Sequence, residues 1–458
     1  MRIVVVGAGL AGLRVACALR EHGHRVKLVE RARRAGGRVR SVYDASTREL
    51  EYEAGPWRVP SKHKRVRTLC SDLGIVLEPL RAPPPPLTTP PPIASGLSIW
   101  GTYALQARDP LIADAYDLDT GYADESRAAS GTNPYMIDSD EFHVASVGFT
   151  TIVERMASKL GSRCIDYETR VVNVRRKNGR YHVEARRRRD DQYESVLYKA
   201  DVLVVCVPPA ACREWDVMRA HAKPVLSAIA PACLNHIYVK EPSLRNVSFH
   251  TRDPRSLLAQ SIGDAYGSGW FQLSYSGGRV ARLWYNLFLS YPLRYLQVLT
   301  SEMWARVGGN RPLQRTDVRM HFWEHAYHYW VPAPGFDLSR AVDLAHEPHP
   351  IQLPNLFLAG EAYSAQQAWM EGALSTADAV VERILHNTHP KTRAVDRSRE
   401  IVLDGRILDV QAWMDVHPGG RRAIEAHMKD ADIDNLFRHI HATDSAWAFA
   451  LSMQRGWS

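Results

Sequence analysis

The chain has 458 residues, of which 45% are hydrophobic and 24% charged, the balance of an ordinary globular protein. This composition excludes a disordered or fibrous chain, and no run of ~18 apolar residues is present to form a membrane-spanning helix. Lysine and arginine outnumber aspartate and glutamate by eight (58 against 50), with much of the excess in Arg186–Arg189 and between Arg31 and Arg40. Such a run is typical of a solvated hairpin tip, so no nucleic-acid partner is expected.

Six cysteines are scattered without paired spacing, and some of them lie in apolar segments, as Cys17 and Cys206 do. This pattern is typical of reduced thiols and not of a disulfide framework. The chain opens directly into the apolar segment Ile3–Val6, with no secretory signal visible. The expected location is therefore the cytoplasm.

The first 75 residues alternate strand and helix signals, which indicates a parallel α/β unit. Eight prolines between Pro79 and Pro92 predict an extended connector, because proline can neither continue a helix nor donate to a sheet. Beyond a helix predicted at Thr151–Leu160, strand patterns lead to a buried strand at Ala200–Val207. Residues 233–330, rich in aromatic side chains, predict an antiparallel substrate region.

A last strand, Leu356–Ala359, precedes a helix predicted at Gly372–Leu385. The polar segment 387–398 contains Pro390 and is the best linker candidate in the chain. The residues after it have a pattern of their own, so residues 399–458 are predicted to form a small separate module.

A glycine-rich turn, Gly7-Ala8-Gly9-Leu10-Ala11-Gly12, joins the first strand to the first helix. Gly7 permits the tight turn, Gly9 lets the backbone approach a pyrophosphate, and Gly12 lets the helix pack on the strand. The helix N-terminus then offers free N–H groups to the phosphates. Glu30 ends the next strand, where it is expected to bind the ribose hydroxyls. The pattern predicts a dinucleotide site.

Two further motifs resemble the FAD-dependent amine oxidase family. One is Val29–Arg38, which ends in Gly36-Gly37-Arg38, and the other is Leu358-Ala359-Gly360-Glu361 followed by Trp369-Met370-Glu371-Gly372. The resemblance implies non-covalent FAD, with Gly37 and Arg38 at its diphosphate and Gly360, Glu361 and Met370 beside the ribityl chain and flavin. It also implies that Val171 lies against the adenine.

A narrower resemblance, to L-amino acid oxidases, is found at Gly55-Pro56-Trp57-Arg58-Val59-Pro60. It implies that Arg58 holds a substrate carboxylate, for which a planar guanidinium is suited through two parallel bonds. An alternative is that Arg58 contacts a flavin phosphate. Trp369 matches the position of an aromatic ring that walls the substrate site, although it could also be an ordinary core tryptophan.

One position departs from the family pattern. The family places a lysine on the strand before a turn that reads Lys240-Glu241-Pro242 here, but Leu234 and Asn235 stand at the expected positions. A flavoprotein-fold protein with a structural or binding role and little or no catalysis therefore remains the alternative function.

The C-terminal residues contain His417-Pro418-Gly419-Gly420 and, further on, Phe437-Arg438-His439-Ile440-His441. Both motifs resemble cytochrome b5, in which two imidazoles bind the iron of haem b. The resemblance implies His417 and His441 as axial ligands, with His439 as the second choice, and an iron suited to electron transfer. A module that keeps the fold without haem is the alternative.

The predicted fold is thus an α/β FAD-binding Rossmann-type domain with an inserted α+β substrate domain, followed by a small α+β cytochrome b5-like module. The oxidase-like region is residues 1–386, with FAD-binding parts at about 1–78, 147–230 and 350–386 and substrate-domain parts at about 79–146 and 231–349. The predicted reaction oxidises a C–N bond of a small amine or L-amino acid, with O2, the fused haem or a redox partner as the electron acceptor.

Overall fold

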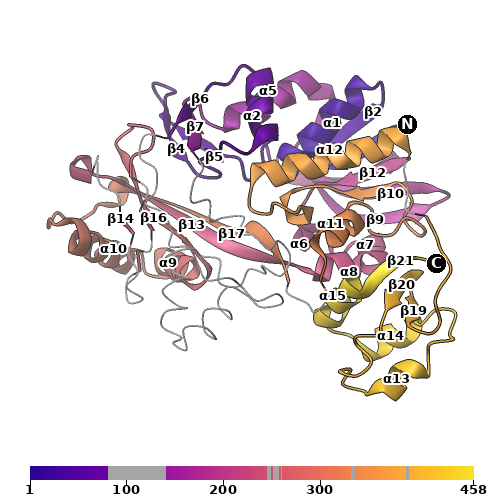
Figure 1. Ribbon diagram of the computed structural model, residues 1–458. Helices are drawn as coiled ribbons and strands as arrows, with labels where there is room; N and C mark the ends of the chain where they lie inside the picture. The colour runs from indigo at the N-terminus through magenta and orange to yellow at the C-terminus, as the bar shows by residue number, and fades with distance from the viewer. Residues whose placement is uncertain are drawn as a thin grey trace.

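A five-stranded parallel sheet forms the centre of the computed structural model, which describes residues 1–80, 141–244, 249–250, 257–258, 260–261, 263–331, 336–387 and 391–458. Its strand order is β18-β12-β1-β2-β8, from β1 (Arg2–Val6), β2 (Arg25–Val29), β8 (Ile165–Asp166), β12 (Val202–Val205) and β18 (Leu356–Leu358). These apolar strands come from segments far apart in the chain, so the nucleotide-binding half is assembled from both ends of the sequence (Figure 1).

Each face of this sheet is covered. Ile3 and Val5 belong to a core shared with α1 (Leu10–Glu21), α5 (Thr150–Leu160) and α12 (Met370–His386). Val4 and Val6 point to the opposite face, as alternation along a strand requires. That face is covered by an antiparallel sheet and short helices: β9 (Thr169–Lys177), β10 (Arg180–Arg189), β11 (Gln192–Ala200), α6 (Pro209–Cys212), α7 (Asp216–His221) and α8 (Lys223–Ser227).

A second layer carries the long antiparallel sheet β16-β13-β17, made of β13 (Ile229–Lys240), β16 (Trp270–Gly277) and β17 (Val318–Trp330). Helices α9 (Gly278–Ser290) and α10 (Pro292–Val307) cover one face of it around Trp284 and Leu299 (Figure 1). The remaining elements of the body are β3 (Ser41–Tyr43), β4 (Leu50–Glu53), β5 (Val59–Pro60), α2 (Lys64–Asp72), β6 (Leu77–Pro79), β7 (Phe142–Ala145), β14 (Phe249–His250), β15 (Gln260–Ser261) and α11 (Leu338–His346).

The C-terminal residues form the sheet β19-β20-β21 with three helices: β19 (Glu400–Leu403), β20 (Arg406–Asp409), α13 (Arg421–Glu425), α14 (Asp434–Ile440), α15 (Asp444–Met453) and β21 (Gln454–Trp457). They have a small core of their own around Val410 and Ile424. However, Ala448 and Leu451 of α15 are buried in the core of the main body, against α8. The module is therefore packed on the body and is not joined to it through the linker alone.

Several expected elements coincide with observed ones. The helix predicted at Thr151–Leu160 is α5, the arginine run closes the β10–β11 hairpin, and all six cysteines are free thiols. Most of the Pro79–Pro92 connector lies outside the described residues. Of residues 1–75, only β1 and β2 join the parallel sheet, with α1 and α2 in the core beside it, because β3 and β4 pair antiparallel away from the sheet. Within the described residues, no helix is long and apolar enough to cross a membrane.

Candidate functional site

The glycine-rich turn between β1 and α1 is shaped for close approach. Gly7 has φ +101°, which an L side chain rarely adopts, and a Cβ at Gly12 would lie 1.9 Å from the Gly7 carbonyl oxygen. A Cβ at Gly9 would meet nothing within 4 Å. The turn therefore leaves open space in front of the α1 N-terminus, where free N–H groups favour an anionic phosphate.

Glu30, at the carboxyl end of β2, is buried and holds this turn in place. One of its carboxylate oxygens accepts the Ala8 N–H at 2.8 Å, and the other accepts the Ala32 N–H at 2.8 Å. The same residue lines the cavity described below, where the expected ribose contact stays a prediction. Glu30 thus fixes two backbone segments that a nucleotide would touch.

The two distant motifs meet at an ion pair whose carboxylate is buried. Arg38 Nη1 lies 2.7 Å from Glu361 Oε2 and donates to the Ala326 carbonyl at 2.9 Å. Glu361 Oε1 accepts the backbone N–H of His328 at 2.7 Å. Burial alone would raise the pKa of Glu361, but the charges of Arg38 and His328 outweigh it and lower the pKa to about 2. The carboxylate is therefore ionised under ordinary conditions.

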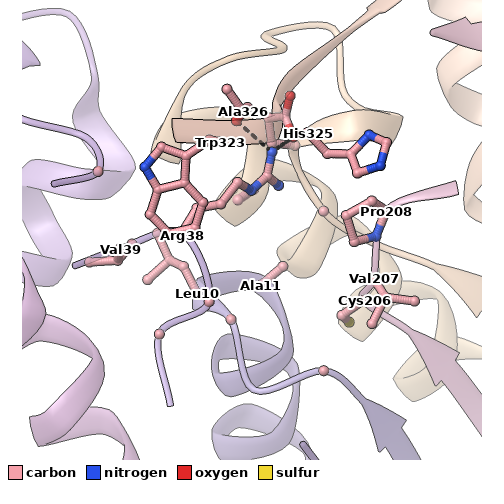
Figure 2. A pocket seen from close by; sticks show the side chains of 18 of the residues that line it. Leu10, Ala11, Arg38, Val39, Cys206, Val207, Pro208, Trp323, His325 and Ala326 are labelled. Atoms are coloured by element: carbon pink, nitrogen blue, oxygen red, sulfur yellow. Dashed lines mark hydrogen bonds and ion pairs between the residues drawn. The ribbon is translucent and has the colours of Figure 1, made fainter. Parts of the chain in front are cut away.

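A single cavity of about 830 Å³ runs between these motifs and the second layer (Figure 2). It is lined by all but one of the residues that the sequence assigned to FAD or substrate: Gly7, Gly9, Glu30, Gly37, Arg38, Arg58, Val171, Gly360, Glu361, Trp369 and Met370. Gly12 is outside the lining and packs against Gly7, which is the packing role expected for it.

The lining fits an anionic dinucleotide with a heteroaromatic ring, the description of FAD. Two ring nitrogens in it, Trp369 Nε1 and His325 Nδ1, are buried without a hydrogen-bond partner among the described residues, so a bound group would satisfy them. Figure 2 shows Cys206, Val207 and Pro208 on the opposite wall from Trp323. Sequence reasoning missed this wall, because its apolar run reads only as a buried strand.

At the substrate end, Arg58 is held between two aromatic rings. Its guanidinium carbon lies 4.6 Å from the Trp57 ring centroid and 4.3 Å from that of Phe142. Trp369 lies edge-on to His63, with ring centroids 4.9 Å apart. Burial lowers the pKa of His63 to about 4, so this imidazole is neutral at pH 7.

Of Leu234 and Asn235, the two residues where the resemblance leads one to expect a lysine, Leu234 lines the cavity. Asn235 does not line it, and its side-chain Oδ1 accepts from Ser276 Oγ at 2.7 Å within the sheet. His236 and Tyr275 line the cavity as well. Neither was singled out from the sequence. Strand alternation from Leu234 could have found His236, but only the pairing of β13 with β16 brings Tyr275 beside it.

The two histidines predicted to bind haem face each other in the C-terminal module. The ring centroids of His417 and His441 lie 5.9 Å apart, with an angle of 76° between the ring planes. Gly419 N–H lies 3.1 Å from Nδ1 of His417, which leaves Nε2 as the ring nitrogen accessible to a ligand. Among the described residues, the ring of His439 makes no contact with the ring of His417, whereas that of His441 does.

Comparison with known proteins identifies the family. Residues 5–73 match the NAD(P)-binding Rossmann-like domain, and residues 104–385 match the flavin containing amine oxidoreductase family. Neither match extends into residues 399–458.

Among curated proteins, an L-amino-acid oxidase of Bungarus fasciatus is 46% identical over 76 residues, which are 16% of this chain and 14% of that protein. A putative L-amino-acid oxidase of Bacillus subtilis (strain 168) is 46% identical over 61 residues, 13% of each chain. The aligned segments are therefore only a small share of these relatives' own length.

Among solved structures, a putrescine oxidase bound to putrescine covers 84% of this chain and 99% of its own, with a TM-score of 0.64 and 14% identity. A putative protoporphyrinogen oxidase from Exiguobacterium sp. 255-15 covers the same shares with a TM-score of 0.63 and 14% identity. At this identity the likeness shows the fold alone. Because the family match spans more than half of the sequence, the chain belongs to the flavin containing amine oxidoreductase family.

Proposed function

We propose that this protein oxidises the C–N bond of an L-amino acid or a related small amine, with non-covalent FAD as the cofactor. The observation that carries the proposal is Arg58, a cation placed between two aromatic rings in the same cavity as Glu30 and the Arg38–Glu361 pair. A guanidinium can bind a carboxylate through two parallel charge-assisted bonds. The relatives named L-amino-acid oxidases support this choice of substrate.

The chain's own residues would divide the work as follows. Arg58 binds the substrate carboxylate and orients the carbon that carries the amine. Trp369 and His63 form an apolar, uncharged wall that excludes water from that carbon. Glu361, kept ionised, holds Arg38 in position at the nucleotide end. FAD held beside Glu30 and the Arg38–Glu361 pair would supply the two-electron oxidation of the C–N bond, and the imine product would hydrolyse in water.

The test begins with the absorbance spectrum of the purified protein, which should show flavin bands. Acid precipitation should release all of the flavin into the supernatant, and flavin left on the pellet would contradict non-covalent binding. Glu30→Lys should yield mostly apoprotein, because a cation would replace the acceptor that holds Ala8 and Ala32. Peroxide formation under air, and reduction of an artificial acceptor, are then measured over a panel of amino acids and amines.

A second candidate is a flavin-binding protein with little or no turnover, and one observation favours it. Leu234, one of the two residues where the resemblance leads one to expect a lysine, lines the cavity. Bound flavin that no member of the panel reduces under anaerobic conditions would support this second candidate and exclude the first.

We also propose that the C-terminal module binds haem b through His417 and His441. Two imidazoles that ligate one iron each direct a ring nitrogen at it from opposite sides, and the ring centroids of this pair are 5.9 Å apart before any haem is bound. Val416 and Ile440, each directly before one of the histidines, are 63% and 60% exposed. A flat apolar macrocycle between the histidines would cover such side chains. Haem held by two imidazoles supplies one-electron transfer, which would make the module an acceptor for the body.

A further inference from the structure

The wall of the cavity formed by β13 and β16 carries a buried histidine that the proposed reaction does not use. Leu234 and His236 are two residues apart on β13, so both side chains point to the cavity face. His236 is only 2% exposed, yet it lines the cavity together with Tyr275, its partner in the β13–β16 register. The two rings meet edge-on, with centroids 5.0 Å apart.

A single hydrogen bond sets the chemistry of this imidazole. The amide nitrogen of Gln272, itself buried, lies 2.9 Å from His236 Nδ1, so Nδ1 accepts and the ring proton sits on Nε2. Burial lowers the pKa of His236 to about 3, so the ring is neutral at working pH. Nε2 has no hydrogen-bond partner among the described residues and is the donor that this wall can offer to a ligand.

The charges around the cavity decide which ligand suits that donor. Two of its carboxylates are already engaged, Glu30 with backbone N–H groups and Glu361 with Arg38, while a third, Glu324, is exposed. The described ring contacts of His236 are with Tyr238 and Tyr275. A second ammonium group on a substrate would meet no carboxylate among these contacts, in a lining whose arginines outnumber its carboxylates.

Two aromatic rings, those of Trp57 and Tyr275, lie between Arg58 and His236 in the chain of contacts along this wall. Trp57 contacts the Arg58 guanidinium and lies edge-on to Tyr275 at 6.4 Å, and Tyr275 in turn contacts His236. With a substrate carboxylate at Arg58, His236 would face a different part of the substrate, because the two side chains contact different aromatic rings, Trp57 and Tyr275.

We propose that His236, oriented by Gln272, is a specificity-determining residue whose Nε2–H binds an oxygen on an aromatic substrate side chain. The subsite takes a phenolic substrate in preference to its phenyl analogue and rejects a substrate with a second ammonium group. This inference rests on the proposed function, since it names the substrate class of the same site.

The experiment compares three amino acids that differ at the side chain: L-tyrosine, L-phenylalanine and L-lysine. Wild-type holoenzyme should prefer tyrosine to phenylalanine by about 10-fold in kcat/KM, the size expected for one added hydrogen bond, and lysine should be poorer than both. His236→Leu should reduce the tyrosine preference to about 1–2-fold, and His236→Gln, which keeps a donor, should restore part of it. Tyramine and phenethylamine give the same comparison if the enzyme takes amines without a carboxylate.

A binding measurement separates this proposal from the proposed function. The dissociation constants of 4-hydroxyphenylacetate and phenylacetate, followed by the shift in flavin absorbance, should show the same preference and the same loss in His236→Leu. His321→Gln is the matched control, since His321 pairs with His236 across the sheet but does not line the cavity. Flavin content shows that each variant has folded.

The outcomes are distinct. No turnover of any substrate, with the phenol preference intact in binding, overturns the proposed function alone. Equal binding and turnover of phenol and phenyl compounds by the wild type overturns the role of His236. So does a His236→Leu variant that changes the flavin spectrum but leaves the preference unchanged.

Discussion

At the scale of the residue, the placement of Arg58 depends on neighbours from two separate segments. Trp57 precedes it in the chain, while Phe142 belongs to β7, which pairs with β5 at Val59 and Pro60. Both rings lie within cation–π distance of the guanidinium and restrict its position.

Arg58→Ala should therefore weaken the binding of a substrate carboxylate by ~2–5 kcal/mol, the range for truncating one partner of a buried charge pair. Amines without a carboxylate should be almost unaffected, because they make no bond to Arg58. Dissociation constants for a matched acid and amine provide the measurement. Arg67→Ala, which removes an exposed arginine bonded to the Ser61 carbonyl, is the control. Equal loss for both ligands would instead assign Arg58 to the flavin or the fold.

Glu53 is a second residue whose environment governs a measurable property. Its carboxyl group is fully buried, where it accepts from Ser41 Oγ at 2.9 Å and from the Phe149 N–H at 2.7 Å. Burial is the largest influence and outweighs these two donors, so the pKa rises to about 8. The folded protein thus holds a proton that the unfolded chain releases at a pH of about 4.3.

A raised carboxyl pKa makes the Glu53 contribution to stability largest below pH ~4.3 and removes it as pH rises toward 8. Glu53→Gln, which stays neutral, should cancel this loss. Between these pH values, the free energy of unfolding of the wild type should fall relative to that of the variant by up to ~1.4 kcal/mol per pH unit. Chemical denaturation of both proteins across this range is the measurement. Parallel curves would mean that Glu53 is ionised when folded.

At the scale of the element, the C-terminal helices position the histidine pair. His417 lies in the loop before α13, with Gly420 at φ +76° at the start of that helix, and His441 directly follows α14. Phe437 packs against His441 with ring centroids 4.6 Å apart, and Trp413 lies 6.2 Å from His417. Both imidazoles are thus attached to loop–helix junctions beside apolar rings.

Protein produced with ample haem should show a low-spin haem spectrum that substrate reduces. His417→Ala or His441→Ala should abolish this spectrum, since each removes one axial imidazole, while the flavin bands remain. His439→Ala should have a much smaller effect and is the internal control. Loss of the signal in His439→Ala would reassign the second ligand, and a wild type without the signal would mean that the module binds no haem.

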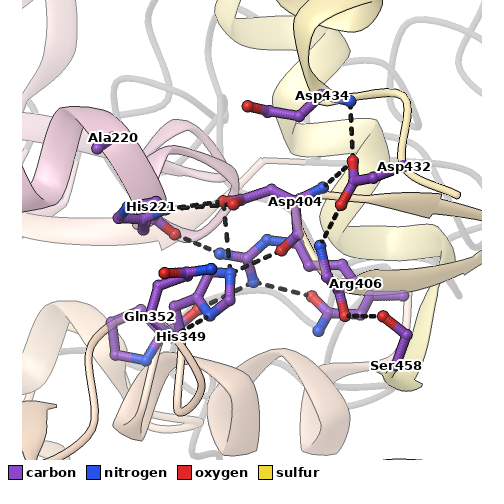
Figure 3. A network of polar contacts seen from close by, with 12 residues as sticks. Ala220, His221, His349, Gln352, Asp404, Arg406, Asp432, Asp434 and Ser458 are labelled. Carbon is purple, nitrogen blue, oxygen red and sulfur yellow. Dashed lines mark hydrogen bonds and ion pairs between the residues drawn. The ribbon is translucent and has the colours of Figure 1, made fainter.

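At the scale of the whole molecule, a polar cluster joins the C-terminal module to the body (Figure 3). Asp404, in the β19–β20 turn, accepts from His221 Nδ1 at 3.1 Å, and its backbone carbonyl accepts from His349 Nε2 at 2.6 Å. His221 ends α7, and His349 lies between α11 and β18. The atoms of these three residues lie within 4.8 Å of one another, as metal ligands do.

The hydrogen bonds of this cluster, however, show where the ring proton of His349 lies. The Gln352 N–H points to His349 Nδ1, so the ring proton is on Nε2 and points at Asp404. Burial would raise the pKa of Asp404, but the hydrogen bonds from His221 and His349 hold it well below its usual range. Among the acidic groups, Asp404 has the largest favourable effect on the charge of the fully buried Arg406, which donates to the Pro348 carbonyl of the body.

Asp404→Asn keeps a residue type that tolerates the positive φ of this turn but removes the charge. It should lower stability by ~1–3 kcal/mol, because the hydrogen bond from His221 loses its anionic acceptor and buried Arg406 loses a favourable charge. The expected signs are a lower midpoint of thermal unfolding and faster proteolysis near residues 387–398. Asp430→Asn, at the exposed His427–Asp430 pair, should change stability by less than ~0.5 kcal/mol. Equal effects of the two substitutions would contradict the role of the cluster.

The sequence by itself determined the nucleotide end of the molecule. Gly7, Gly9 and Gly12 act within one strand–turn–helix unit, and backbone geometry restricts what such a unit can do. The motif Val29–Arg38 and the motif that begins at Leu358 could be recognised from the sequence for the same reason, since each is a short segment with its own turn. The expectation that Arg58 and Trp369 share a cavity with the nucleotide motifs came from a resemblance, and the structure places both in the lining together with Gly7, Gly9 and Glu361.

Only the tertiary structure decided which side chains complete the cavity and how the C-terminal module sits. His236 and Tyr275 come together because β13 pairs with β16, and the pairing of strands 40 residues apart leaves no local signal. The attachment of the module depends in the same way on α15 burying Leu451 against the body and on Asp404 meeting His221 and His349. Contacts between distant segments are set by packing and charge across the whole fold, which local sequence patterns do not encode.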